Sequence, residues 1–315
     1  MADEGLTAGA VARRLGVAVT TLRTWHQRYG LGPSEHVPGH HRRYTEHDLE
    51  RLEVMRRLTT QGIAPAEAAA FARRSLLAPP VAPAVAPPVA PAAAPLGAPA
   101  AAPAGGGHTI ALGRATPAAR GLARAGMRLD AASMRDILEM VVAERGVVGA
   151  WNDVIMPVLI GVGQRYQVTK LFVEVEHLIS RSVTEVLGAV PRPGSTDPRV
   201  LLAAADEEQH TLPLEALAAA LAEANVPSRL LGGRVPPRAL ADAIARTGPT
   251  VVVLWSQTPR TADPTQLTAI FEVPRPPLLV TAAGPGWPAE LPPGVTRLNN
   301  LDEAVKTIQA AAGPS

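Results

Sequence analysis

A proline-rich stretch divides this chain of 315 residues into two parts. Residues 76–107 contain nine prolines between Pro79 and Pro103 and end in three consecutive glycines. Because proline fixes the backbone angle φ and has no N–H for a helix or a sheet ladder, the stretch favours an extended polyproline linker. At about 3 Å per residue this linker could reach on the order of 75 Å. Such segments can also bind SH3-like partners, but the composition favours the role of a spacer.

The residues before the linker predict two short helices, a turn and a basic tip. Apolar residues recur at helical spacing over 6–15, Gly16 ends that helix, and a second helix is expected over Val17–Arg28. Two helices joined by a glycine turn form a helix-turn-helix, whose second helix enters the DNA major groove. The tip at residues 40–44 suits contacts with phosphates and the minor groove. The candidate DNA-binding residues are Thr20, Thr21, Arg23, Trp25, Arg28, Tyr29, His40, His41, Arg42, Arg43 and Tyr44.

These residues resemble the winged helix-turn-helix of the MerR family of transcription regulators. The resemblance rests on TLRTWHQRYGL, followed by GHHRRYTEHDLERL and a further helix expected over Thr45–Leu58. It implies a double-stranded DNA operator as partner, a dimer or tetramer on that operator, and RNA polymerase as a further partner. The alternative is a small solvated helical domain whose arginines only keep it soluble.

Charge and composition agree with a DNA-binding head at residues 1–75. The head contains 11 arginines, no lysine and 8 acidic residues, whereas the whole chain has a formal net charge of only +2. Five of the eight histidines also lie in the head, where DNA or solvent contacts fit them better than a metal site. The absence of cysteine excludes disulfides, thiolate metal sites and a catalytic thiol. We find no signal-peptide pattern and no apolar run of about 18 residues, so we expect a cytoplasmic protein that does not enter a membrane.

Two further patterns follow the linker. Residues 108–190 predict a four-helix bundle, in which Pro157 should kink the third helix. Residues 196–315 predict alternating short apolar strands and amphipathic helices, which indicate a parallel sheet covered on both faces. Ligands of such sheets bind beyond the carboxyl ends of the strands, and His210 follows the first strand. The expected strands are 200–205, 228–231, 250–255 and 277–281, and the expected helices are 116–126, 131–144, 147–166, 172–187, 214–224, 237–246, 264–271 and 301–312.

This order of domains resembles the light-responsive, cobalamin-binding MerR-type repressors of the CarH type. In that family a helical bundle caps a flavodoxin-like (Rossmann-like) domain, and the histidine of an Asp-x-His-x-x-Gly loop binds cobalt. Here the loop at 208–213 reads EQHTLP, so Glu208 keeps an acid two residues before His210, able to orient its ring. The family's Trp, nine residues, then Glu-His reads here as Tyr166, nine residues, then Glu176-His177. A Glu-His pair on a helix is by itself more often a solvated or structural feature.

The resemblance implies a corrinoid, adenosylcobalamin, between bundle and sheet. His210 would be the lower ligand of its cobalt, and light would break the cobalt–carbon bond, shift the bundle and loosen the assembly on DNA. The implied cofactor-binding residues are Tyr166, Val173, Glu176, His177, Glu208, His210, Ser256, Thr258 and Gly284.

The sequence departs from the family pattern at three places. Pro213 replaces the loop glycine, Thr258 ends the Ser-x-Leu motif, and Ala283-Gly284 replaces Gly-Gly. Added side chains crowd the channel for the nucleotide tail of the cofactor. The alternative is therefore a MerR-type regulator whose cobalamin-like domain has lost or changed its ligand, acting through another small molecule or a protein partner. Corrinoid modules also serve methyltransferases and mutases, but the chain has no room for their substrate-activating domain, so we do not expect an enzyme.

Overall fold

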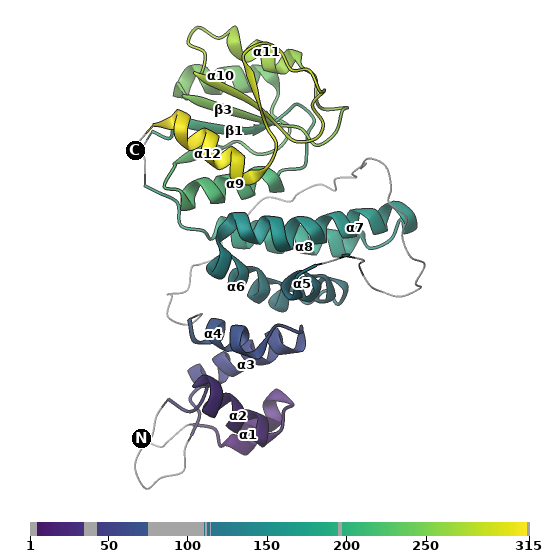
Figure 1. The fold of residues 1–315 in the computed structure, drawn as a ribbon, viewed down its shortest axis with the longest axis vertical. Coiled ribbons are helices and arrows are strands. Elements are labelled where there is room, and N and C mark those ends of the chain that lie inside the picture. Colours follow the sequence, from purple (N-terminus) through teal and green to yellow (C-terminus); the bar gives the residue numbers. More distant parts are fainter. Residues whose placement is uncertain are drawn as a thin grey trace.

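The computed structural model describes residues 5–34, 43–74, 110, 112–113, 115–194 and 197–313. Figure 1 shows three parts along the long axis of the molecule: the head, a helical bundle and an α/β domain. This arrangement confirms the predicted fold class of α and α/β parts. The predicted linker, residues 76–107, lies outside the described residues.

The head is built from four helices with well-defined ends. Gly16 adopts a left-handed conformation with φ of 65° and ends the first helix as predicted. The third helix begins with a capping box, in which Thr45 and Asp48 satisfy each other's backbone N–H groups. The fourth helix was not predicted; it buries Ala68 and Phe71 in the core of the head. The helices are α1 (Ala8–Leu15), α2 (Val19–Tyr29), α3 (Glu46–Thr60) and α4 (Pro65–Arg74).

The bundle has the predicted four helical segments, and its backbone is irregular at two places. The backbone leaves the helical conformation at Gly146 (φ 69°, ψ 174°), and a π-helical turn precedes Pro157. Because Pro157 has no N–H, the carbonyl of Asp153 lacks its usual helical donor and accepts a hydrogen bond from the Thr116 hydroxyl instead, at 3.3 Å. The break at Gly146 is the predicted boundary between the second and third segments, and the third segment is irregular just before Pro157. The segments are α5 (Pro117–Met127), α6 (Ala131–Ala150), η1 (Trp151–Ile155), α7 (Met156–Thr169) and α8 (Val173–Gly188).

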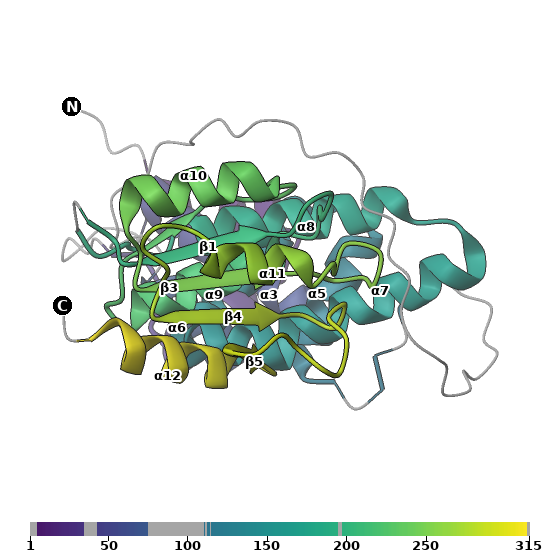
Figure 2. The same cartoon turned by 90° about the horizontal axis from the view of Figure 1, so that it is seen from above.

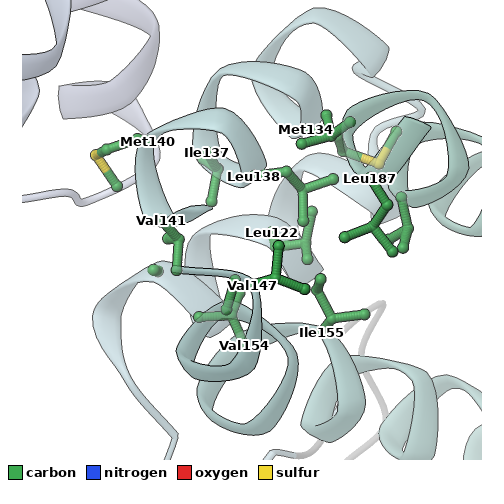
Figure 3. Packing of buried hydrophobic residues seen from close by; sticks show 14 of the residues in the cluster. Leu122, Met134, Ile137, Leu138, Met140, Val141, Val147, Val154, Ile155 and Leu187 are labelled. Atoms are coloured by element: carbon green, nitrogen blue, oxygen red, sulfur yellow. The ribbon is translucent and has the colours of Figure 1, made fainter. Parts of the chain in front are cut away.

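Large aliphatic side chains from the bundle helices fill its centre. Figure 3 shows Leu122, Ile137, Leu138 and Ile155 pointing toward one another, and all four are fully buried or nearly so. The continuous helical stretch Ala131–Thr169 is long and apolar enough, by length and composition alone, to cross a membrane. Sequence analysis did not single it out. In the structure 39% of its most apolar window is buried, and these buried side chains belong to the bundle core.

The α/β domain contains a parallel sheet of five strands in the order β2-β1-β3-β4-β5. This order is that of flavodoxin-like folds and places the topological switch point between β1 and β3. The half-exposed edge strand β5 was not predicted. The strands are β1 (Val200–Ala204), β2 (Ser228–Leu230), β3 (Val251–Trp255), β4 (Leu279–Ala283) and β5 (Val295–Leu298).

Four helices cover the two faces of the sheet. On the outer face α10 and α11 bury Leu240 and Leu267, and on the other face α9 and α12 bury Leu221 and Ile308. Helix α9 also packs against α6 and α8, so the bundle lies under this second face. In Figure 2 the arrow of β4 points toward the side on which α7 extends beyond the sheet. The helices are α9 (Leu212–Glu223), α10 (Pro237–Thr247), α11 (Thr265–Phe271) and α12 (Leu301–Ala312).

Candidate DNA-binding and ligand sites

One face of α2 is exposed and polar, as a DNA-reading helix requires. Thr20, Arg23 and Arg28 are exposed on this helix, and Thr21 is partly exposed. Thr24 and Gln27, which sequence analysis did not select, lie on the same exposed face because they are four and seven residues after Thr20. Figure 1 places α2 at the end of the molecule away from the bundle, so this face is open to a partner.

Two of the predicted DNA contacts are buried in the head, and a third is hydrogen-bonded within it. Trp25 and Tyr44 are only 7% and 5% exposed, because both pack in the core of the head. Tyr44 also pairs with Leu6 through two backbone hydrogen bonds of 2.8 Å. Arg43 donates a hydrogen bond from its guanidinium to the carbonyl of Gly5 at 2.9 Å, which ties the chain after the wing to the N-terminal segment. Tyr29 is half-buried against the core, and His40, His41 and Arg42 lie outside the described residues.

At the other end of the molecule, the loop after β1 holds His210 in a fixed orientation. The Nδ1 atom of His210 lies 2.5 Å from Oε1 of Glu208, and the same oxygen accepts the backbone N–H of His210 at 2.9 Å. A neutral imidazole that donates its Nδ1 proton to Glu208 has a lone pair on Nε2. That Nε2 is buried and has no hydrogen-bond partner among the residues that the structure describes. An imidazole backed by a carboxylate in this way is the usual arrangement of a metal-binding histidine.

The second oxygen of Glu208 joins this loop to the loop after β3. Its Oε2 accepts hydrogen bonds from the Thr261 hydroxyl at 2.6 Å and from the backbone N–H of Gln257 at 2.8 Å. Burial by itself would raise the pKa of Glu208, but the hydrogen bonds from His210, Thr261 and Gln257 outweigh it and lower the pKa to about 2. Glu208 is therefore a carboxylate at neutral pH and holds the proton of His210 on Nδ1.

Thr261, Gln257 and Gln266 are parts of this site that sequence analysis missed. The side-chain oxygen of Gln266 accepts the backbone N–H of Asp206 at 2.8 Å, and its amide donates to the carbonyl of Thr261 at 3.2 Å. These residues lie some 50 to 60 positions after the loop that they support. The pairing of β1 with β3 brings them to this loop. Gln257 lies inside the Ser-x-Leu motif, but no local motif indicated Thr261 or Gln266.

Ser256, Thr258 and Gly284, which were expected to bind the cofactor, are packed inside the rim. The Ser256 hydroxyl is fully buried and bonded to Thr261 at 2.8 Å and to the carbonyl of Thr258 at 3.1 Å. Gly284 has φ of 100°, and a Cβ there would lie 2.2 Å from the carbonyl oxygen of Ser256. Glycine at 284 is thus required by the close approach of two loops.

The four residues expected to cap the ligand gather around the turn between α7 and α8. Tyr166 is half-buried near the end of α7, with the ammonium of Lys170 5.2 Å from its ring centroid. Val173 and His177 are exposed on the first turns of α8. Between them, Glu176 accepts a hydrogen bond from Ser180 at 3.0 Å and lies 3.6 Å from Nε2 of His177. These side chains offer an aromatic ring, an apolar surface and two polar groups to a ligand.

Two protein families match parts of this chain. Residues 6–75 match the family described as MerR HTH family regulatory protein. Residues 118–190, which contain the bundle, match the family described as B12 binding domain. Both domain types were predicted from the sequence, and the matches confirm them.

One curated relative and two solved structures are similar to this chain. The chain is 29% identical over 265 residues to the HTH-type transcriptional repressor CarH of Myxococcus xanthus, an alignment that covers 84% of this chain and 82% of the relative. Among solved structures, the Methanosarcina barkeri monomethylamine corrinoid protein is similar with 11% identity and a TM-score of 0.49, over 59% of this chain and 94% of that protein. A cobalamin-binding protein from Desulfitobacterium hafniense is similar with 18% identity and a TM-score of 0.33, over 61% of this chain and 97% of that protein.

Proposed function

We propose that this chain, which carries a MerR-type helix-turn-helix domain and a B12-binding domain, is a transcription repressor whose hold on its operator depends on a corrinoid. The corrinoid is adenosylcobalamin, bound where the rim of the sheet faces the α7–α8 turn. His210 would hold the cobalt through Nε2, Glu208 would orient its ring, and Tyr166, Val173, Glu176 and His177 would contact the ligand. When bound, such a cofactor supplies a cobalt–carbon bond that light can break.

The observation that supports this proposal is the state of the His210 ring. Its Nε2 is buried without a partner, while Nδ1 is fixed by a carboxylate whose pKa is lowered to about 2. A histidine with only a structural role would be expected to satisfy both ring nitrogens when they are buried. The residues present therefore fit a metal at Nε2.

The test is uptake of adenosylcobalamin by the full-length protein in the dark, followed by absorbance and by DNA binding before and after illumination. We expect wild type to bind and to release DNA in light. His210→Ala should lose the spectral signature of histidine ligation and bind at least about tenfold more weakly, since removing a ligand or its support costs that much in comparable metal sites. His47→Ala, which removes an exposed histidine of α3, should behave as wild type. Wild type without corrinoid uptake would refute the proposal.

The DNA-binding half of the proposal rests on the exposed face of α2. Arg23→Ala should weaken operator binding by about 1–3 kcal/mol if Arg23 contacts a base edge, or reduce the salt dependence of binding if it contacts a phosphate. Arg246→Ala makes the same change of charge at the end of α10, in the α/β domain, and should leave binding unchanged. Equal binding by both variants at every salt concentration would show that α2 does not read DNA.

One observation favours a second candidate function. The loops after β3 and β4 are packed so closely at Ser256 and Gly284 that these residues show no channel for a nucleotide tail. A regulator of the same architecture could use another small molecule or a protein partner at this rim. The uptake experiment distinguishes the two candidates, because only the first predicts corrinoid absorbance.

The remaining parts of the proposal follow from the same architecture. The symmetric operators of helix-turn-helix regulators require at least a dimer, and we propose that the sensor domains supply the self-association of a dimer or tetramer. We also propose a cytoplasmic regulator without catalytic activity, with RNA polymerase as a further partner at the operator.

A further inference from the structure

Within the described part of the chain, two polar atoms at the carboxyl rim of the sheet are buried without a hydrogen-bond partner. One is Nε2 of His210, and the other is the indole nitrogen of Trp255. A buried N–H group without an acceptor is unfavourable, and native structures keep one where a water, an ion or a ligand provides the missing partner. The two atoms come from neighbouring strands, because Ala204, at the end of β1, is paired with Trp255, at the end of β3.

The position of the Trp255 ring is fixed by its surroundings. The backbone carbonyl of Trp255 accepts the N–H of Ala205 at 2.9 Å, which anchors it beside the loop that carries His210. Its ring lies over Gly284, since a Cβ at 284 would be 3.2 Å from Cδ2 of the indole. The side chain packs on the sheet face that is turned toward α9 and the bundle. Trp255 is only partly buried although its nitrogen is shielded.

A second tryptophan in the same rim shows what a purely structural indole looks like here. Trp287 is buried, and its Nε1 donates a hydrogen bond to the carbonyl of Ala283 at 3.0 Å. The two indoles therefore differ in one respect that matters for binding. The N–H of Trp287 is used by the fold, and that of Trp255 is not.

We propose that Trp255 is a ligand-contacting residue whose indole N–H donates a hydrogen bond to an oxygen on the periphery of the bound corrinoid. This inference rests on the proposed function. The chemistry required of the ligand is a carbonyl or phosphate oxygen, because the indole nitrogen can only donate. Corrinoids carry such oxygens on their side-chain amides and, when the nucleotide tail is present, on its phosphate.

The test uses Trp255→Phe, which removes the N–H and keeps an aromatic ring, with Trp287→Phe as the matched control. In the ligand-free protein, Trp287→Phe should lower the melting temperature more than Trp255→Phe, because only the control loses a hydrogen bond within the fold. In the dark titration with adenosylcobalamin, Trp255→Phe should bind about tenfold more weakly than wild type, as expected when one buried hydrogen bond is lost. The Trp287→Phe variant should bind within about twofold of wild type.

A parallel titration with cobinamide, which lacks the nucleotide, identifies the oxygen. A loss of affinity for both compounds supports a contact with a corrin amide, and a loss for adenosylcobalamin alone supports a contact with the phosphate. Wild-type uptake with unchanged affinity in Trp255→Phe overturns this contact and leaves the proposed function standing. A wild-type protein that takes up neither compound overturns both.

Discussion

Two buried carboxylates, one at the rim of the sheet and one where the bundle contacts the head, have pKa values that are shifted in opposite directions. Glu208 at the rim accepts four hydrogen bonds from three residues of its own domain, and they lower its pKa to about 2 despite burial. Asp136 on α6 pairs with Arg57 of α3, whose Nε lies at 2.5 Å. There burial raises the pKa of Asp136, and the opposing guanidinium does not offset it.

The difference indicates which of the two regions can open. A carboxylate that its surroundings stabilise in the charged form rigidifies the loop that carries it. For the second carboxylate, the free energy lost on removal from water exceeds the free energy gained from its partner. Separation of the two surfaces restores its hydration. Polar contacts also lie near Asp136: Gln61 donates to the Ser133 hydroxyl at 3.3 Å, and the carbonyl of Gln61 accepts from Arg124. We therefore expect the rim to keep its shape and the joint between head and bundle to be the part that moves.

Among the variants considered for stability, Glu208→Gln should lower the free energy of unfolding the most. The amide cannot accept from all the donors that converge on the carboxylate, and its NH2 group would face the N–H of Gln257 or the Thr261 hydroxyl. A shift of the pKa from 4.5 to about 2 corresponds to a contribution on the order of 3 kcal/mol at neutral pH. Because the folded-state pKa is lowered, that contribution is present above pH 4.5 and is lost as the pH falls from 4.5 toward 2. Denaturant unfolding from pH 7 to pH 3 should show this loss in wild type and not in the variant.

Glu207→Gln is the matched control for this experiment. Glu207 is the exposed neighbour of Glu208 and pairs with Arg234 at 2.5 Å on the surface. Exposed pairs contribute about 0–1 kcal/mol, so this variant should keep the wild-type dependence of stability on pH. If Glu208→Gln and Glu207→Gln lower the free energy of unfolding by similar amounts, the rim is no more rigid than the surface around it.

A smaller effect is expected from Thr261→Val, which removes one donor to Glu208 without changing shape. Since Thr261 is buried and its hydroxyl lies 2.6 Å from Oε2 of Glu208, the free energy of unfolding should fall by about 1–2 kcal/mol. The pKa of Glu208 should rise toward its ordinary value. Thr268→Val, whose exposed hydroxyl bonds only a carbonyl of its own helix, should cost less than about 0.5 kcal/mol. A titration of the Glu208 side chain by NMR would measure the rise directly, and an unmoved pKa would exclude Thr261 as a support.

The sequence predicted most helices but not all strands, for a physical reason. Helix α12 was predicted at its observed ends, because an amphipathic period is bounded by Asn300, whose side chain caps it, and by Gly313. The half-exposed strand β5 was missed because it has one buried residue and lacks the apolar run that marks β1 and β3. Local patterns did not suffice for every element, because α4 was missed although one of its faces is buried, whereas the other edge strand, β2, was predicted.

The candidate site also contains residues that could be predicted from a local pattern and residues that could not. Glu208 and His210 were predicted to act together because two residues of one loop can be judged from sequence alone. Thr261 was not predicted, because its contact with Glu208 exists only after β1 and β3 have paired. Trp25 was wrongly assigned to DNA, since a helix of eleven residues does not reveal which aromatic side chain its neighbours will cover.

The smallest change in stability, about 1 kcal/mol, is expected at the joint beneath the head, where Arg57→Ala removes the partner of a buried acid. The guanidinium is partly exposed, so solvent already screens the pair. The structural effect should nevertheless be large, because the variant leaves Asp136 unpaired at the contact and favours separation. The chain has no cysteine, so spin labels can be attached through Gln27→Cys on α2 and Val168→Cys on α7, both exposed.

We expect a narrow distribution of distances between the two labels in the otherwise unchanged chain and a broad one in Arg57→Ala. Arg135→Ala is the control, because it also removes an arginine that pairs with a carboxylate. The partner of Arg135 is Glu185 on α8, at 2.6 Å, so this pair lies within the bundle and the head should stay docked. Asp136→Asn should give an intermediate result, because it removes the charge whose pKa burial raises while keeping a group that can accept from Arg57. If the distribution stays narrow in Arg57→Ala, the head is held by apolar contacts such as that of Met140, which in Figure 3 points away from the bundle core toward the head. In that case the two carboxylates would differ in their pKa, but this difference would not make the joint between head and bundle more mobile than the rim.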